Sequence, residues 1–124
     1  MGKNGYRITK GETGWFFELL PSNRNNQPFG ISPMYLTKEE CITKLEEFIR
    51  FLSAKEIKDT SSDYVKIRKT GDLICIFEYA RDGKILLYRS LPFNGSSNLS
   101  EARDCINRIY KYRNEFLKYR KPEA

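Results

Sequence analysis

The chain has 124 residues, of which 40% are hydrophobic and 14% aromatic, enough to bury the core of one domain without disulfides or metals. It contains no histidine, which excludes Ser-His-Asp and Cys-His catalysis and histidine-ligated metal sites. The net charge of +6 is uneven, because residues 1–62 carry nine basic and eight acidic side chains, whereas residues 63–124 carry thirteen and eight.

The start of the chain is polar and rich in glycine, so we do not expect a secretory signal peptide there. Tyr6 stands where N-myristoylation requires Ser or Thr, and no apolar run approaches the ~20 residues of a membrane span. Cys41, Cys75 and Cys105 lie far apart and form no CxxC pair, and their odd number fits a reducing compartment. We therefore expect a cytoplasmic protein with no cofactor, no metal and no membrane contact.

The first half of the chain reads as three strands followed by a helix. Residues 6–19 predict two strands around a glycine-containing turn, and residues 28–32 predict a third strand. A helix is predicted to begin at Thr37, because Thr37 and Glu40 have the spacing of a capping box. Behind this cap, an apolar stripe at helical spacing is expected to face the core: Cys41, Ile42, Leu45, Phe48, Ile49 and Leu52.

The second half repeats this order. Residues 64–79 predict two strands, Asp82-Gly83 predicts a tight hairpin, and residues 85–90 predict a third strand. An insertion over residues 94–99 delays the last helix to about Ser100. Its apolar stripe matches the first at an offset of 64: Cys105, Ile106, Ile109, Tyr112 and Phe116. Further pairs that correspond between the copies are Phe17/Phe77, Glu18/Glu78 and Ser32/Ser90.

These repeats predict an α+β fold built from a duplicated strand-strand-strand-helix motif. Short turns within each strand triplet require antiparallel pairing. We expect one domain over residues 1–124, with repeats at 6–52 and 64–119 and a linker at 53–63. The sheet and helices are expected to form two layers, with both helices on one face and a pseudo-twofold relation between the repeats.

The segments at residues 6–52 and 64–116, and especially residues 13–45, resemble the YegP-like family of small tandem-repeat bacterial proteins. The shared pattern is an aromatic strand after a glycine turn, a third strand ending in Ser-x-x-aromatic, and a helix beginning with Thr or Ser. Here Ser32 precedes Tyr35, and Ser90 precedes Phe93. The resemblance implies the duplicated fold and implies no biochemical activity.

Two pairs of equivalent residues have side chains that could carry chemistry. Cys41 and Cys105 lie near helix starts, but a free cysteine is more often a small core residue, and we expect both to face the core. Glu18 and Glu78 are expected to form cross-strand pairs with Arg7, Lys66 and Arg68 rather than an acid-base pair. The sequence therefore predicts no catalytic residues and no enzyme activity.

The sheet face opposite the helices is the first candidate for a partner surface. If the helices cover the face that bears Trp15, Phe17, Cys75 and Phe77, alternation leaves Phe16, Ile74 and Ile76 on the other face. A polar rim is expected around this apolar strip, formed by Arg7, Glu18, Lys66, Arg68 and Glu78. We predict that this face meets a partner, most simply a second copy of the chain, unless the linker or the 94–99 insertion covers it.

Nucleic acid is the alternative partner, because the second half is basic and the C-terminal helix interleaves tyrosines with cations as far as Lys121. The candidate residues for this alternative are Arg108, Lys111, Arg113, Lys118, Arg120 and Lys121. Two predicted i,i+4 pairs, Asp104 with Arg108 and Lys111 with Glu115, favour an ordinary solvated face instead. The sequence thus favours a non-catalytic interaction or assembly module over a nucleic-acid binder.

Overall fold

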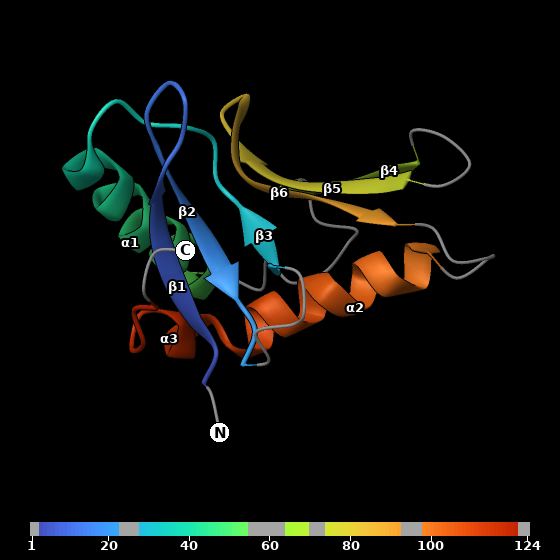
Figure 1. Cartoon of the computed structure of the whole chain (residues 1–124). Coiled ribbons are helices and arrows are strands. Elements are labelled where there is room, and N and C mark those ends of the chain that lie inside the picture. The colour runs from blue at the N-terminus through green and yellow to red at the C-terminus, as the bar shows by residue number, and fades with distance from the viewer. Residues whose placement is uncertain (1–2, 23–27, 55–63, 70–73, 93–97, 122–124) are drawn as a thin grey trace.

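The computed structural model describes residues 3–22, 28–54, 64–69, 74–92 and 98–121. Its elements in chain order are β1 (Gly5–Lys10), β2 (Trp15–Leu20), β3 (Gly30–Ile31), α1 (Lys38–Ala54), β4 (Val65–Lys69), β5 (Ile74–Arg81), β6 (Lys84–Pro92), α2 (Asn98–Lys111) and α3 (Arg113–Phe116) (Figure 1).

The six strands form one sheet in the order β1-β2-β3-β6-β5-β4, and all neighbouring strands are antiparallel. The third strands of the two repeats meet at the centre, where Ile31 of β3 lies opposite Tyr88 of β6. This order is unchanged when the repeats are exchanged, as a pseudo-twofold axis between β3 and β6 requires. The predicted α+β fold with a duplicated strand-strand-strand-helix motif is confirmed.

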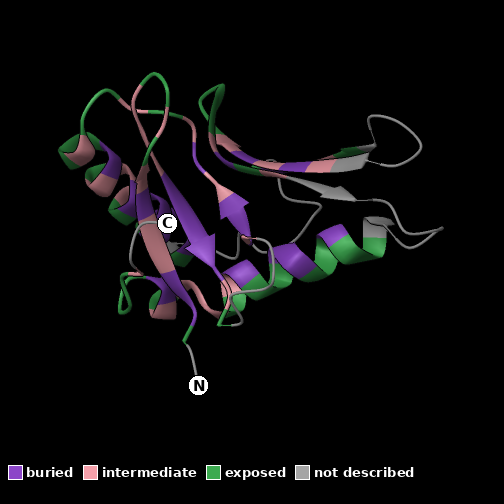
Figure 2. Ribbon diagram, viewed as in Figure 1, coloured by how far each residue is buried: buried purple, intermediate pink, exposed green. Residues whose placement is uncertain are grey.

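The two long helices, α1 and α2, pack on the same side of the sheet and enclose a single core. Alternation along the strands turns Ile8, Phe17, Phe77 and Tyr79 toward the helices, and all four are fully buried. The helices carry their buried side chains on the surface that faces the sheet, as the colouring of α2 in Figure 2 shows. The core therefore lies between the two layers, as the sequence predicts.

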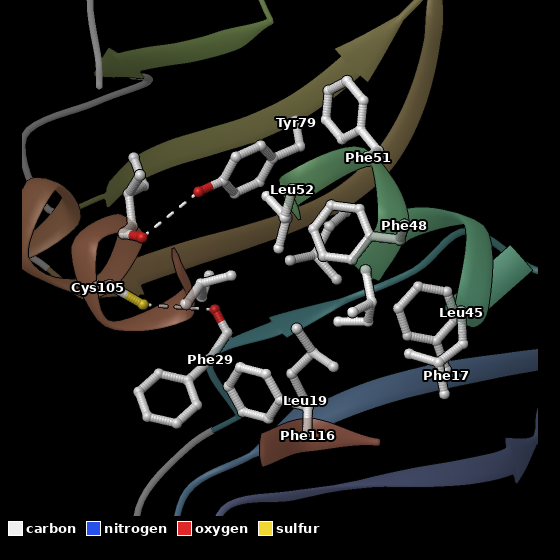
Figure 3. Packing of buried hydrophobic residues seen from close by; sticks show 14 of the residues in the cluster. Phe17, Leu19, Phe29, Leu45, Phe48, Phe51, Leu52, Tyr79, Cys105 and Phe116 are labelled. Carbon is white, nitrogen blue, oxygen red and sulfur yellow. Dashed lines mark hydrogen bonds between the residues drawn. The ribbon is translucent and has the colours of Figure 1, made fainter. Parts of the chain in front are cut away.

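Aromatic rings from both repeats meet at Phe48 of α1 (Figure 3). Its ring centroid lies 5.4 Å from that of Tyr79 on β5 and 6.2 Å from that of Phe17 on β2. The Tyr79 hydroxyl donates to the main-chain oxygen of Ile106 in α2 at 3.4 Å. Side chains thus cross between the repeats, so the two halves share one core rather than holding separate ones.

Local signals read from the sequence are confirmed at the first helix and at the second hairpin. The Glu40 N–H donates to the Thr37 hydroxyl at 3.0 Å, which caps α1. Asp82 and Gly83 have φ values of 54° and 75°, as the central residues of a type I′ turn require. The helix α1 continues to Ala54, two residues into the predicted linker, and residues 55–63 lie outside the described part of the chain.

The predicted C-terminal helix is interrupted at Tyr112 and ends at Phe116. The chain leaves helical geometry at Tyr112 (φ −100°, ψ 12°), makes the short helix α3 and then runs alongside the edge of β1. There the Tyr6 N–H donates to the Tyr119 oxygen at 2.9 Å, and the Lys121 N–H donates to the Tyr6 oxygen at 2.7 Å. The edge of β1 supplies main-chain partners that a continued helix could not use, and this contact overrides the helical pattern of the sequence.

The glycine at position 5 permits this close approach. A Cβ atom there would lie 2.1 Å from the Tyr119 oxygen, so any larger residue would push the C-terminal segment away from β1.

The third strands correspond differently from the sequence match. The Ser32 N–H donates to the Phe17 oxygen, whereas the residue opposite Phe77 is Arg89 and Ser90 lies opposite Ile76. In the structure, Ser32 of the first repeat therefore corresponds to Arg89 of the second repeat. The sequence match predicts Ser90, which is the next residue. The turns that lead into the two third strands differ in length, so a shared Ser-x-x-aromatic pattern does not fix their register.

Candidate functional site

Cross-strand register brings the predicted partner residues onto the face of the sheet opposite the helices. Arg7 lies opposite Glu18, Lys66 opposite Glu78, and Arg68 opposite Ile76. We call this surface the open face and define it by the following residues: Arg7, Phe16, Glu18, Ile31, Lys66, Arg68, Ile76, Glu78 and Tyr88. Ile74, also predicted here, lies in β5 opposite Pro92, but its side chain is outside the described part of the chain.

The sequence analysis missed the centre of the open face. Glu18 lies opposite Ile31, Ile31 opposite Tyr88, and Tyr88 opposite Glu78, so one row of side chains crosses the join between the repeats. Tyr88 is 39% exposed, and Ile31 is half-buried. Only the pairing of β3 with β6 puts these two residues side by side, and no local pattern predicts that pairing.

The ion pair in the first repeat is largely buried. Arg7 Nε and Nη2 donate to the two Glu18 oxygens at 2.9 and 3.1 Å, and the Thr9 hydroxyl donates to Glu18 Oε1 at 3.0 Å. Glu18 is only 6% exposed. The hydrogen bond to Glu18 raises the pKa of Arg7 above its ordinary value, so this guanidinium stays charged. A bidentate pair of this kind holds both side chains in fixed positions.

The equivalent pair in the second repeat is more open. Arg68 Nη2 lies 2.7 Å from Glu78 Oε1, and the Arg68 side chain is 61% exposed. This contact is diagonal, because Lys66 rather than Arg68 stands directly opposite Glu78. Water screens such a pair, which makes it weaker than the pair between Arg7 and Glu18.

The geometry favours structural roles for both carboxylates. Glu18 and Glu78 are separated by three strand spacings, roughly 14 Å at ~4.8 Å each. A cooperating pair of catalytic carboxyl groups stands about 5–9.5 Å apart. Each carboxylate also accepts hydrogen bonds from an arginine of its own repeat. These contacts match the expected cross-strand pairing.

Cys41 and Cys105 are buried in the core, as predicted. Burial and the nearby Glu40 carboxylate raise the pKa of the Cys41 thiol to about 11. Burial also raises the pKa of Cys105, although Arg89, whose Nη1 lies 3.1 Å from the sulfur, acts in the opposite direction. Both thiols are therefore protonated near neutral pH, which is the opposite of what an activated nucleophile needs.

The residues proposed for nucleic acid separate into two groups. Arg108, Lys111 and Arg113 lie where α2 ends and α3 begins, whereas Lys118, Arg120 and Lys121 lie on the C-terminal segment beyond α3. The predicted pair of Asp104 with Arg108 forms at 3.2 Å. Since the helix breaks at Tyr112, Glu115 does not meet Lys111, and its Oε1 accepts from the Asn4 main-chain N–H at 3.0 Å instead.

Two neighbouring cavities lie on the outer surface of α2, and neither was predicted from the sequence. The first, of about 480 Å³, lies between α2 and the chain segments that precede β1 and follow β2. We call it the α2 groove and define it by its lining residues: Asn4, Pro21, Ser22, Phe29, Asp104, Asn107, Arg108, Lys111 and Tyr112. The second adjoins it and is lined by Asn107, Tyr110, Lys111 and Arg113.

Within the described residues, no cluster of cysteines and carboxylates has the arrangement of a metal site. No helix in the same part of the chain is long and apolar enough to cross a membrane. Compared with known proteins, the chain matches no family model, no curated protein and no solved structure. The proposals below therefore depend on the residues and their geometry.

Proposed function

We propose that this chain is a non-catalytic assembly module whose open face binds a second copy of itself. The observation that carries the proposal is the apolar strip across the middle of the sheet. Phe16, Ile31 and Ile76 are half-buried there, and Tyr88 is 39% exposed. Apolar side chains that lie on an open sheet face and are flanked by charged ones are typical of a protein interface.

Four of the five charged residues that the open face carries are already paired within one chain. Arg7 forms an ion pair with Glu18, and Arg68 forms one with Glu78. Burying charges that already have partners costs less than burying isolated ones, because their hydrogen bonds persist in the complex. The rim can therefore lose water on dimerisation without leaving a carboxylate uncompensated.

A second copy fits the open face better than a polyanion does. The face carries Arg7, Lys66 and Arg68 against Glu18 and Glu78, so its charges nearly balance. Two such faces do not repel one another strongly, whereas a phosphate backbone is attracted by a clear excess of cations. A twofold axis would also place each strip against an identical one.

Two further proposals accompany this function. We propose that the chain belongs with the YegP-like tandem-repeat proteins, supported by the two strand-strand-strand-helix copies. We also propose that it works in the cytoplasm, because buried thiols such as Cys41 and Cys105 persist in a reducing compartment.

Substitution of Tyr88 or Ile76 by Lys is expected to weaken dimerisation about tenfold or more, because each variant buries an unpaired ammonium group in the interface. Analytical ultracentrifugation across a range of protein concentrations measures this change. The matched control is Leu117→Lys, since Leu117 is 38% exposed, close to Tyr88, but lies outside the open face. Its dimerisation should equal that of the wild type.

Circular dichroism of each variant establishes that the fold is retained. A wild-type chain that sediments as a monomer at every concentration contradicts the proposal. So does a Tyr88→Lys variant that remains folded and dimerises as well as Leu117→Lys.

Nucleic acid is the second candidate partner. The observation that favours it is the gathering of Arg108, Lys111 and Arg113 along one side of the α2 region, beside two cavities. Single-stranded nucleic acid is the better fit of the two forms, because its unpaired bases can stack on aromatic rings. Stacking on Tyr110 would displace the Arg113 guanidinium, which lies 4.0 Å from the centroid of that ring.

Binding of a single strand should fall steeply with salt. If the three cations of the α2 region each contact a phosphate, the slope of log K against log salt is about −2, and it approaches about −4 if all six candidate cations take part. Fluorescence anisotropy of a labelled oligonucleotide at several salt concentrations gives this slope. Absence of binding at low ionic strength removes the second candidate.

A further inference from the structure

The α2 groove contains the buried side-chain amide of Asn4, which is hydrogen-bonded to the protein through its oxygen. Asn4 is 8% exposed, and its Oδ1 accepts from the Ser22 N–H at 2.8 Å. This bond fixes the orientation of the side-chain amide, because the oxygen must face the Ser22 N–H. Neither of the two hydrogen bonds that Asn4 makes within the described residues uses Nδ2 as the donor, so a hydrogen-bond donor remains available beside the groove.

Other groove residues add donors around this amide. Arg108 and Lys111 lie three residues apart on α2, nearly one turn, and both line the groove with the Asn107 amide and the Ser22 segment. Asp104 is the one carboxylate among the described residues that line the groove, and Arg108 Nε lies 3.2 Å from it. The remaining N–H groups of Arg108, the Lys111 ammonium group and Asn4 Nδ2 form a donor-rich wall that favours an anion.

The size and the other walls of the groove indicate what this anion is attached to. A volume of about 480 Å³ is far larger than an inorganic phosphate ion needs. Pro21 and Tyr112 are half-buried and form apolar walls, and the Phe29 ring, which is 6% exposed, packs 6.4 Å from the Tyr112 ring. Small-molecule sites commonly combine apolar walls with a few convergent polar groups in this way.

We propose that the α2 groove binds the phosphate ester of a nucleotide-sized ligand. Asn4, Arg108 and Lys111 hold the phosphate, and the organic part lies against Pro21 and Tyr112. A free nucleotide and a phosphodiester of a single strand offer the same phosphate chemistry. This site lies apart from the open face and does not depend on dimerisation.

The test is a titration of the full ¹⁵N-labelled chain followed by NMR, with three probes: inorganic phosphate, adenosine monophosphate and a short single-stranded oligothymidylate. Binding should shift the side-chain amide signals of Asn4 and the main-chain signals of Ser22, Asn107 and Lys111. Adenosine monophosphate should bind about tenfold or more tightly than phosphate, because its organic part adds contacts. A nucleotide that outcompetes the oligothymidylate identifies a free nucleotide as the ligand, and the reverse order identifies a strand.

The decisive variant is Asn4→Asp. It keeps an oxygen that can accept from the Ser22 N–H but replaces the amide donor by a carboxylate oxygen, so nucleotide affinity should fall about tenfold or more. The matched control is Arg103→Gln, which lowers the net charge by the same amount at an exposed residue of α2 that lies outside the groove. Its affinity should stay within about twofold of the wild type.

A second variant is Lys111→Gln. Because the Lys111 side chain is exposed, this substitution should leave the fold intact, and it should weaken nucleotide binding as Asn4→Asp does. Suppose that sodium chloride of matched ionic strength causes the same NMR chemical-shift changes as the nucleotide. The changes would then be a general salt effect, and the proposal would be overturned. Wild-type affinity in a folded Lys111→Gln variant would also overturn it, whatever the outcome at Asn4.

Discussion

Replacing Phe48 with Ala should lower the free energy of unfolding by about 3–5 kcal/mol, as expected for truncation of a buried aromatic ring. Phe48 is 1% exposed, and its ring lies among those of Phe17, Phe51 and Tyr79 at centroid distances of 5.4–6.3 Å. Since Phe17 and Tyr79 belong to different repeats, the substitution opens a cavity where the two halves meet. Urea denaturation followed by Trp15 fluorescence and circular dichroism measures the loss.

Tyr112 provides the matched control, because it occupies the equivalent position in the second repeat but is only half-buried. Tyr112→Ala should cost clearly less than Phe48→Ala. In the wild type, fluorescence and circular dichroism should report a single coincident transition, since the repeats share one core. Equal losses in the two variants would show that Phe48 does not join the halves.

Replacing Arg7 with Ala should also destabilise the protein by about 3–5 kcal/mol, because it leaves the Glu18 carboxylate buried without its charged partner. The same substitution at Arg68 should cost about 1 kcal/mol or less, because the Arg68 side chain is 61% exposed and water screens its pair with Glu78. Both variants lose one arginine from equivalent strands, so each is a control for the other. Denaturant unfolding of the two proteins under the same conditions compares them directly.

A double variant, Arg7→Leu with Glu18→Leu, separates loss of the pair from loss of packing. Removing both charges should recover much of the stability lost in Arg7→Ala, because no buried carboxylate remains unpaired. Similar losses in Arg7→Ala and Arg68→Ala would contradict the difference in burial. Failure of the double variant to recover would show that the arginine contributes mainly by packing.

The sequence alone determined the element types and the duplication. The apolar stripe of α1, the Thr37 cap and the Asp82-Gly83 hairpin each depend on residues a few positions apart, so the chain carries these signals locally. Alternation in the strands also placed Arg7, Phe16 and Glu18 on one face. These features were predictable because backbone geometry fixes which nearby side chains share a face.

Tertiary structure alone decided how these elements meet. It pairs β3 with β6, which puts Ile31 beside Tyr88 at the centre of the open face, and it turns the expected end of the last helix into a segment along β1. It also brings Asn4 to α2, about a hundred residues away in the chain, to form the α2 groove. Contacts between distant segments depend on which edges and surfaces are left unpaired once the local elements have formed, and no short pattern in the sequence encodes that choice.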